Sequence, residues 1–321
     1  MAAVIGIIAL TGISGVMAQQ NSPAGPGQYV ENVGAAGSIN WSTGILTAVG
    51  IGAPPERFYG KPQARPMAMR AAQVDAYRKL LEVAQGVRIN ATTTVRDYAV
   101  ESDVVRTQVE GLVRGAQIVK SEYLSDGTVE VTVTMPLSGA STGLGQAIYP
   151  RVLATPGIPM TPPSGYQPPA PPSGYPATPA QPQPLQPQPQ PQPQPQTPAP
   201  APAPQVPSQV FTGLVIDARG IQARPAMSPK IVDENGEEVY GSMFVDREYA
   251  VQQGMTGYAR DLTAAQSNER VTNNPLTIKG IKSEGPGKSN IVISNANAGQ
   301  LRAASENLTF LKKCRVMIVL D

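Results

Sequence analysis

The sequence contains no histidine and only one cysteine among its 321 residues. The lack of histidine excludes His-dependent catalytic triads, histidine general bases and His-ligated metal sites. With Cys314 alone, neither an intrachain disulfide nor a multi-cysteine metal site can form. Because Cys314 lies in an apolar run that reaches residue 320, we expect a buried strand cysteine rather than a reactive thiol.

An excess of charge of one sign is also missing. Residues 19–151 carry 12 basic and 11 acidic side chains, and residues 208–321 carry 13 and 12, so each half has a net charge of +1. Neither half has the basic excess of a nucleic-acid-binding domain. The P-loop, Rossmann and nucleophile-elbow motifs are absent as well. The sequence therefore predicts a protein that is not an enzyme, with no cofactor, no metal site and no nucleic-acid partner.

Charged side chains are absent from residues 1–30, and residues 1–18 form an apolar run that ends in small residues. This pattern is typical of a secretory signal peptide cleaved after Ala18, and the run is short for a membrane-spanning anchor. No cysteine lies near the cleavage point to accept a lipid. We expect a periplasmic protein, peripheral to the outer membrane, without a direct lipid anchor. Residues 19–37 are expected to be disordered.

Proline and glutamine dominate the middle of the chain. Residues 155–207 hold 22 of the 34 prolines, and no charged side chain occurs between Arg151 and Asp217. Proline removes backbone donors, and so little apolar surface cannot offset the entropy of ordering, which predicts a disordered polyproline II linker over residues 151–208. Fully extended at roughly 3.1 Å per residue, residues 155–207 could reach on the order of 160 Å. The sequence thus predicts two α+β domains, 38–150 and 209–321, held at a distance from each other.

The first domain has recognisable local patterns. We expect strand structure over residues 38–52 and 87–95, and a hairpin around the turn Asp126-Gly127. A helix is predicted from Arg65 to Gln85, and a second from Ser102 or Asp103 to Gly111 or Arg114. The apolar stripe predicted for the first helix consists of Met67, Ala71, Val74, Tyr77 or Arg78, Leu81 and Ala84.

Residues 72–119, with the pattern "LLE", "ESD" and "GLVRGA", and the following DGTVEVTVTMPL resemble the bacterial twenty-kilodalton outer-membrane lipoprotein family. A similar domain opens the flagellar assembly protein T, a periplasmic component of basal-body rings. The resemblance covers residues 64–137 and implies envelope proteins as partners, either flagellar or outer-membrane components. The acylated cysteine of the lipoproteins is lacking here, which brings the soluble, flagellar type closer.

The second domain is predicted to contain several strands and one helix. Strands are predicted at 211–217, 276–281, 290–293 and 315–320, with a hairpin at Asn235-Gly236 and a helix over 299–312. A helix between two strands favours either a βαβ unit or an α+β sheet with helices on one face.

Candidate site residues are few. Asp217, Arg219 and Arg224 follow a predicted strand and are the candidate ligand or partner contacts, with Asp217 and Arg219 expected to pair with each other. The acidic residues that surround the 235–236 turn could bind Ca²⁺, although a solvated hairpin tip commonly has this composition. They are Asp233, Glu234, Glu237 and Glu238.

The leading hypothesis is a non-catalytic exported envelope scaffold or assembly protein, associated with the flagellar basal body or the outer membrane, and a homo-oligomer is compatible with it. The alternative is a periplasmic ligand- or glycan-binding protein with its pocket near Asp217, Arg219 and Arg224. A third hypothesis, an envelope hydrolase, needs two converging carboxylates or a serine beside a lysine.

Overall fold

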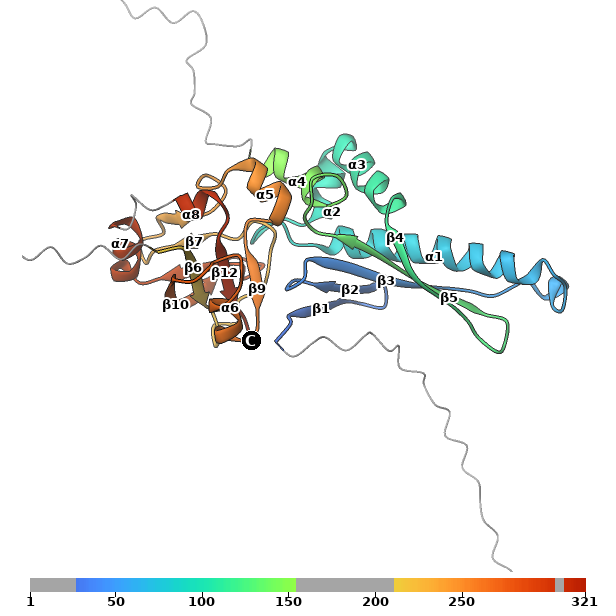
Figure 1. Ribbon diagram of the computed structural model, residues 1–321. Helices are drawn as coiled ribbons and strands as arrows, with labels where there is room; N and C mark the ends of the chain where they lie inside the picture. The colour runs from blue at the N-terminus through green and yellow to red at the C-terminus, as the bar shows by residue number, and fades with distance from the viewer. Residues whose placement is uncertain (1–26, 154–210, 304–308) are drawn as a thin grey trace, which may run out of the picture.

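The structure, a computed structural model, describes residues 27–153, 211–303 and 309–321. The predicted signal peptide and nearly all of the predicted linker lie outside these residues. The described chain forms two α+β domains, each built around one sheet, which confirms the predicted fold class (Figure 1). Within the described parts, no helix combines the length and hydropathy needed to cross a bilayer.

The N-terminal domain contains an antiparallel sheet in the order β1-β2-β3-β5-β4. Its strands are β1 (Val30–Val33), β2 (Gly37–Asn40), β3 (Ile45–Gly52), β4 (Gln117–Tyr123) and β5 (Val129–Pro136). Strand β1 pairs with β2, so the disorder expected for residues 19–37 is wrong there. The predicted hairpin joins β4 to β5, with Gly127 at φ +84°. Buried and half-buried residues alternate along β5, as an antiparallel sheet with one covered face requires.

Helix α1 (Ala64–Gly86) covers one face of this sheet, after a short 3₁₀ turn at Glu56–Phe58. The predicted apolar stripe is correct at Ala84 and in part at Tyr77 and Leu81, which pack against the core, but it is wrong at Ala71 and Val74, because the helix buries a neighbouring face. Val74 in the predicted stripe is 63% exposed. The buried residues are Ala68, Ala72, Ala76, Leu80, Val83 and Ala84.

Two glycines of β3 explain which face of α1 is buried. A Cβ atom placed on Gly50 would lie 2.1 Å from the backbone N of Ala76, and one on Gly52 would lie 2.3 Å from the carbonyl O of Ala68. The helix backbone therefore touches the strand more closely than side chains of ordinary size permit. Only a face of small residues fits such an approach, so the alanines at every fourth position face the sheet.

Two short helices close one end of this domain. Helix α2 (Val95–Glu101) begins with a capping box between Thr94 and Asp97. Helix α3 (Asp103–Arg114) is capped by Ser102, as predicted, and buries Val105, Val109 and Val113. The strand predicted over 87–95 is wrong, since this segment forms one isolated bridge and the start of α2.

The C-terminal domain contains a mixed sheet in the order β8-β7-β11-β10-β6-β12-β9. The strands are β6 (Gly213–Asp217), β7 (Ile231–Val232), β8 (Glu238–Tyr240), β9 (Gly257–Ala259), β10 (Pro275–Glu284), β11 (Asn290–Ile293) and β12 (Val316–Val319). Central strand β6 runs parallel to both β10 and β12. The four residues of β12 are all buried, which is the pattern of a strand covered on both faces.

The helices of this domain are α5 (Arg247–Gln253), α6 (Leu262–Gln266), α7 (Asn295–Ala303) and α8 (Thr309–Lys312). The last two occupy the predicted helix, with residues 304–308 outside the described structure. Strand β11 is antiparallel to β10, whereas β12 is separated from β10 by β6 and runs parallel to it. The predicted βαβ unit is therefore wrong. A sheet with helices on one face only is not observed either, because alternate residues of β6 and β12 pack into two clusters, one with α8 and the other with α6.

Cys314 is buried, as expected, but it precedes β12 instead of lying within it. Its backbone has φ +55°, directly after α8. Burial raises the pKa of the thiol to about 12, against which nearby Arg270 acts only in part. The group therefore stays protonated at neutral pH, in agreement with a structural cysteine.

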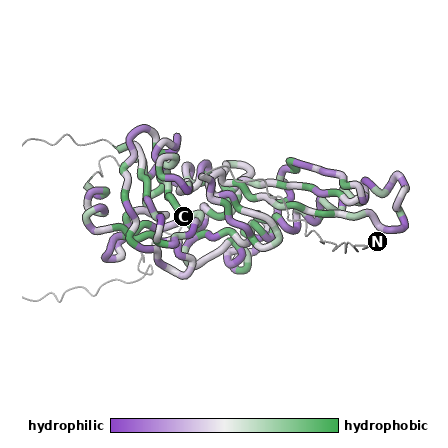
Figure 2. The backbone as a smooth tube through the Cα atoms, turned by 90° about the horizontal axis from the view of Figure 1, so that it is seen from below, coloured by the Kyte–Doolittle hydropathy of each residue, from purple (hydrophilic) through white to green (hydrophobic). Residues whose placement is uncertain are grey.

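The two domains are in direct contact (Figure 1). A single hydrophobic core contains buried residues of both sheets, among them Trp41 and Leu46 from the first and Tyr240 and Tyr258 from the second. Helix α4 (Gly145–Val152) at the end of the N-terminal domain packs against α5. The expectation that the linker holds the domains at a distance is therefore wrong. Figures 1 and 2 show an elongated molecule in which α1, β3 and β5 extend away from the C-terminal domain as an arm with a hydrophilic tip.

Candidate functional site at the domain junction

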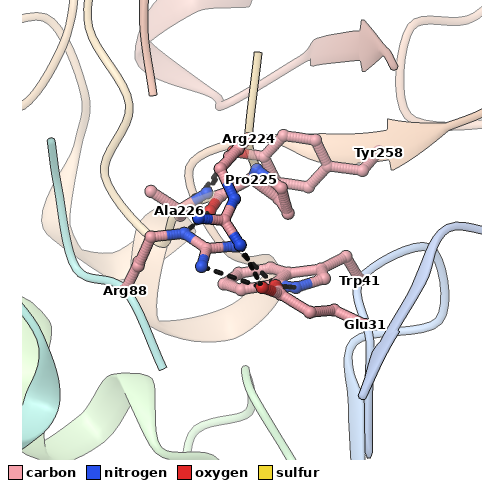
Figure 3. A network of polar contacts seen from close by, with 7 residues as sticks. All are labelled: Glu31, Trp41, Arg88, Arg224, Pro225, Ala226 and Tyr258. Atoms are coloured by element: carbon pink, nitrogen blue, oxygen red, sulfur yellow. Dashed lines mark hydrogen bonds and ion pairs between the residues drawn. The ribbon is translucent and has the colours of Figure 1, made fainter. Parts of the chain in front are cut away.

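The charged side chains at the junction form one network, centred on Arg88 (Figure 3). Its guanidinium donates to both carboxylate oxygens of Glu31, at 2.9 and 2.5 Å, and its Nε donates to the carbonyl O of Pro225 at 2.9 Å. The side chains of Arg88 and Glu31 are only 14% and 17% exposed. The two-pronged pair lies within the N-terminal domain and fixes the orientation of the Arg88 guanidinium, whose bond to Pro225 then connects it to a loop of the C-terminal domain.

Glu31 receives two further bonds. The indole Nε1 of Trp41 donates to its Oε2 at 3.0 Å, and Arg224 donates to its Oε1 at 3.3 Å. Burial favours the neutral form of Glu31, but the bonds and charge of Arg88, with the bond from Trp41, outweigh it, so its pKa lies below the usual value. The carboxylate is therefore ionised at neutral pH and is fully occupied by donors.

Aromatic rings complete this contact. The rings of Trp41 and Tyr258 meet edge to face, with centroids 5.7 Å apart. The Tyr258 hydroxyl donates to the carbonyl O of Ala226 at 2.7 Å and accepts from its N–H at 3.0 Å. The Arg88 guanidinium lies 5.9 Å from the Trp41 ring centre. The loop at 225–226 is thus held from both sides.

The segment predicted as a strand, 87–95, docks on the C-terminal domain instead. The carbonyls of Arg88 and Ile89 accept from the N–H groups of Met227 and Ser228, at 2.9 and 2.6 Å. The carbonyl of Ala91 accepts from the N–H of Gly287 at 2.6 Å. The backbone carbonyls of this segment therefore bond to the C-terminal domain instead of to a neighbouring strand of their own sheet.

Tyr149 of α4 reaches into the C-terminal domain. Its hydroxyl donates to the carbonyl O of Met227 at 3.0 Å and accepts from the N–H of Met255 at 3.4 Å, and the residue is 2% exposed. Burial raises the pKa of Tyr149, so the phenol is neutral at any physiological pH. It serves as a buried hydrogen-bonding anchor between the domains.

A cleft of about 590 Å³ lies beside these contacts and is lined by both domains. Its walls include the turn at 41–45, residues 136–138, the segment 252–258 and the segment 268–270. Trp41 and Tyr258 are each 4% exposed, so their ring faces are used in packing and leave little surface for a ligand. The cleft could hold a polar ligand of modest size, recognised by amide, hydroxyl and guanidinium groups.

Two charged residues line this cleft, Glu269 and Arg270, and Arg270 makes several hydrogen bonds there. Its guanidinium donates to the carbonyl O of Gly254 at 3.1 Å, to that of Cys314 at 2.8 Å, and to that of Gln253. Burial lowers the pKa of Arg270, opposed by the nearby tyrosines and Cys314. The carbonyls of Gln253 and Gly254 lie at the C-terminal end of α5, so the arginine caps that helix, and its bond to Cys314 joins the helix to the segment before β12.

Of the three residues predicted as contacts, two lie together and the third lies elsewhere. Asp217 and Arg219 form the expected ion pair, with bonds of 2.8 and 2.9 Å at the end of β6. Arg219 also borders a shallow depression of about 500 Å³ that contains Lys279 and Asn297. Arg224 lies at the junction, paired with Glu31. The three therefore do not converge on one pocket, and their role as ligand contacts stays a prediction.

The acidic residues near Asn235-Gly236 anchor helix α7 and the sheet. Arg302 pairs with Asp233 at 2.9 Å and with Glu237 at 3.2 Å, and Asp233 is only 2% exposed. Glu234 accepts from the N–H of Asn295 at 2.9 Å, and Glu238 pairs with Lys230 at 2.8 Å. The four acidic residues thus bind groups of the protein itself, which fits neither the calcium site nor the simply solvated turn considered from the sequence. Across residues 27–153, 211–303 and 309–321, no group of three potential metal ligands was found.

Comparison with protein families finds a match to the C-terminal domain. Residues 213–321 match the family described as the second domain of Treponema pallidum Tp0624. This is well under half of the chain, and it does not overlap residues 64–137, for which the resemblance to the lipoprotein family stays a prediction. No curated protein matches the chain.

Proposed function

We propose that this protein is a non-catalytic, exported envelope scaffold or assembly protein, associated with the outer membrane or the flagellar basal body. The observation that supports the proposal most directly is the network around Arg88 and Glu31, in which Arg88 bonds to Pro225 and Glu31 to Arg224 across the junction of one elongated body. The charged residues at the junction are occupied by one another. A rigid body that keeps its charges for internal contacts is suited to hold other components in fixed positions.

The second support is the exposed apolar surface of the N-terminal domain. Val74 on α1, Val100 on α2 and Val104 on α3 are 63%, 81% and 60% exposed. Around Val74 a shallow groove of about 450 Å³ is bordered by Met67, Arg70 and Arg78. Exposed apolar side chains that gather beside arginines mark surfaces where proteins commonly contact one another.

The test is capture of partners from the envelope by the full-length tagged protein, followed by mass spectrometry. We expect outer-membrane or basal-body proteins to be enriched, and Val74→Asp to reduce their recovery without a change in thermal unfolding. The matched control is Gln73→Asp, a change to the same residue at the neighbouring position of α1. Deletion of the gene should impair motility or envelope integrity; normal motility, basal bodies and envelope integrity would contradict the proposal.

The second candidate function is the binding of a small polar ligand, favoured by the 590 Å³ cleft between the domains. A glycan held by aromatic stacking is less suited to this cleft, because Trp41 and Tyr258 are nearly fully buried. Thermal-shift measurements against periplasmic solutes and peptidoglycan fragments test it. A ligand that raises the melting temperature of the wild type but not of Asn268→Ala would support this function over scaffolding.

A further inference from the structure

Strand β4 (Gln117–Tyr123) is the outer strand of the N-terminal sheet, and all seven of its residues are exposed. Among the residues that the structure describes, β5 is its only strand neighbour. The apolar side chains Ile118, Val119, Tyr123 and Leu124 are between 41% and 56% exposed. A strand of this length with an open edge presents a row of backbone groups ready to pair with another strand.

The hairpin geometry shows which backbone groups are open. The N–H of Leu124 donates to the carbonyl O of Thr128 at 2.8 Å, so residue 124 directs its backbone groups toward β5. In an antiparallel pair this direction alternates from one residue to the next. Lys120 and Glu122 therefore also face β5, and the N–H and C=O groups of Ser121 and Tyr123 point outward.

These directions restrict how a second copy of β4 could pair antiparallel with the first. Outward-facing residues must lie opposite one another, so the register can change only in steps of two residues. One register places Ser121 opposite Ser121 of the second copy, and Lys120 then lies opposite the other copy's Glu122. The two adjacent registers place Lys120 opposite Lys120, or Glu122 opposite Glu122. Only the first brings opposite charges together on both sides of the axis.

The apolar side chains follow the same symmetry. In this register Val119 lies opposite Tyr123 of the second copy, whereas the bulge interrupts the alternation beyond Val119, so Ile118 and Leu124 do not share a face. Lys120 already pairs with Glu122 of its own chain at 2.8 Å, with both side chains at least half exposed. Two copies would therefore place four charges of alternating sign on one face of the sheet and the Val119–Tyr123 pairs on the other. The bulge between Ile118 and Lys120 leaves the central residues 120–122 regular.

From these observations we propose that the protein forms a two-fold symmetric homodimer by antiparallel pairing of β4 with β4, with Ser121 on the axis. The two five-stranded sheets become one continuous sheet, and the open edge of each is closed by the other. The occupant is a second copy because β4 is complementary to itself in charge and in apolar side chains. The inference goes beyond the envelope role and is tested on purified protein alone.

The first experiment measures the monomer–dimer equilibrium of the full chain by analytical ultracentrifugation. Lys120→Glu should weaken dimerisation by about tenfold or more, since it creates two like-charge pairs across the axis. The double variant Lys120→Glu with Glu122→Lys restores opposite charges and should recover the wild-type association. The matched control Lys282→Glu changes a lysine that pairs with a glutamate two residues away, Glu284, on β10 of the other sheet.

The second experiment maps the axis by crosslinking. Ser121→Cys places a thiol opposite its own copy, with Cα atoms about 5.5 Å apart, a separation that a disulfide spans. Mild oxidation should give a covalent dimer, whereas Tyr123→Cys, whose partner is Val119, should give much less. Circular dichroism establishes that each variant is folded.

Three results would overturn the proposal. A wild type that stays monomeric at every accessible concentration would do so, as would a dimer that is indifferent to Lys120→Glu. Equal crosslinking at 121 and 123 would also contradict it. None of these results bears on capture of envelope proteins, so the dimer and the scaffold role can fail separately.

Discussion

The two sheets of this protein differ in how much of their surface is covered. Along β5 of the N-terminal domain buried and half-buried residues alternate, whereas β6 and β12 of the C-terminal domain are buried almost throughout. A sheet with one open face can contact other molecules through that face and through its edge strand. The central strands of a sheet that is covered on both faces cannot. The N-terminal domain therefore exposes more of its sheet than the C-terminal domain does.

The domains also use charge differently. At the junction Glu31 pairs with Arg88 of its own domain in a mostly buried contact and with Arg224 of the other domain. On the arm, Asp75 accepts from the N–H of Ile51 at 3.1 Å, and Lys79 donates to the carbonyl O of Val49 at 3.0 Å. These bonds occupy β3 beyond the end of β2, where a strand neighbour is missing. Charge therefore holds the domains together at one end and closes a sheet edge at the other.

The largest effect is expected for Arg88→Ala at the junction. The change leaves the Glu31 carboxylate in a poorly solvated place without its main partner, and losing one member of a buried pair costs about 3–5 kcal/mol. Urea unfolding should show a lower midpoint or a separate transition for each domain. Arg224→Ala is the matched control: its side chain is 54% exposed, so the expected loss is below about 1 kcal/mol. Equal losses for both variants would show that Arg88 is not the centre of the network.

The next effect concerns the arm alone. Gly50→Ala places a Cβ about 2 Å from backbone atoms of α1, and overpacking of this kind costs about 3 kcal/mol. The loss should appear in the transition of the N-terminal domain and leave the other domain unchanged. In the control Gly111→Ala, the new Cβ meets nothing within 4 Å inside helix α3, and stability should rise by up to about 1 kcal/mol.

A smaller effect is expected for Tyr149→Phe. The ring keeps its packing, but the carbonyl of Met227 and the N–H of Met255 lose a partner, at a cost of about 1–2 kcal/mol. Hydrogen exchange should increase at the amide of Met255, which loses its acceptor, while the arm is unaffected. Unchanged exchange at this amide would mean that the hydroxyl does not link the domains.

The smallest effect is a dependence on pH at the edge of β3. Partial burial favours neutral Asp75, but bonds from Arg78, Lys79 and the Ile51 N–H outweigh it and lower its pKa from 3.8 to about 2. A lowered pKa in the folded state gives stability that is present above about pH 4 and is lost as the pH falls toward 2. Unfolding at a series of pH values should show this decline, and Asp75→Asn should flatten it. An unchanged slope in this variant would assign the acid sensitivity to other groups, such as Glu31.

Local patterns allowed part of the fold to be predicted. The alternation along β5, the Asp126-Gly127 turn and the Ser102 cap of α3 are fixed by neighbouring residues and were recognised. The buried face of α1 was not, because Gly50 and Gly52 determine it from another element. The short helices α4, α5 and α6 went unrecognised because they are too brief to show a hydrophobic period.

The candidate site shows the same limit. Asp217 and Arg219 are two residues apart, and their pairing was predicted correctly. The partner of Arg224 is Glu31, 193 residues away in the sequence. A single sequence carries no signal that connects two charged residues across such a separation. The only local hint of the junction was the extended, β-branched segment at 87–95, which was assigned to the wrong sheet.

The docking of the two domains gives the long tether between residues 153 and 211 a thermodynamic meaning. A covalent connection makes docking an intramolecular event, with an effective concentration on the order of millimolar for a short tether and falling only slowly with length. The junction can therefore be weak as a bimolecular contact and still be closed nearly all the time. Proteolysis within the tether would turn a permanent arrangement into one that depends on concentration, so a single cut could release the arm from its anchor.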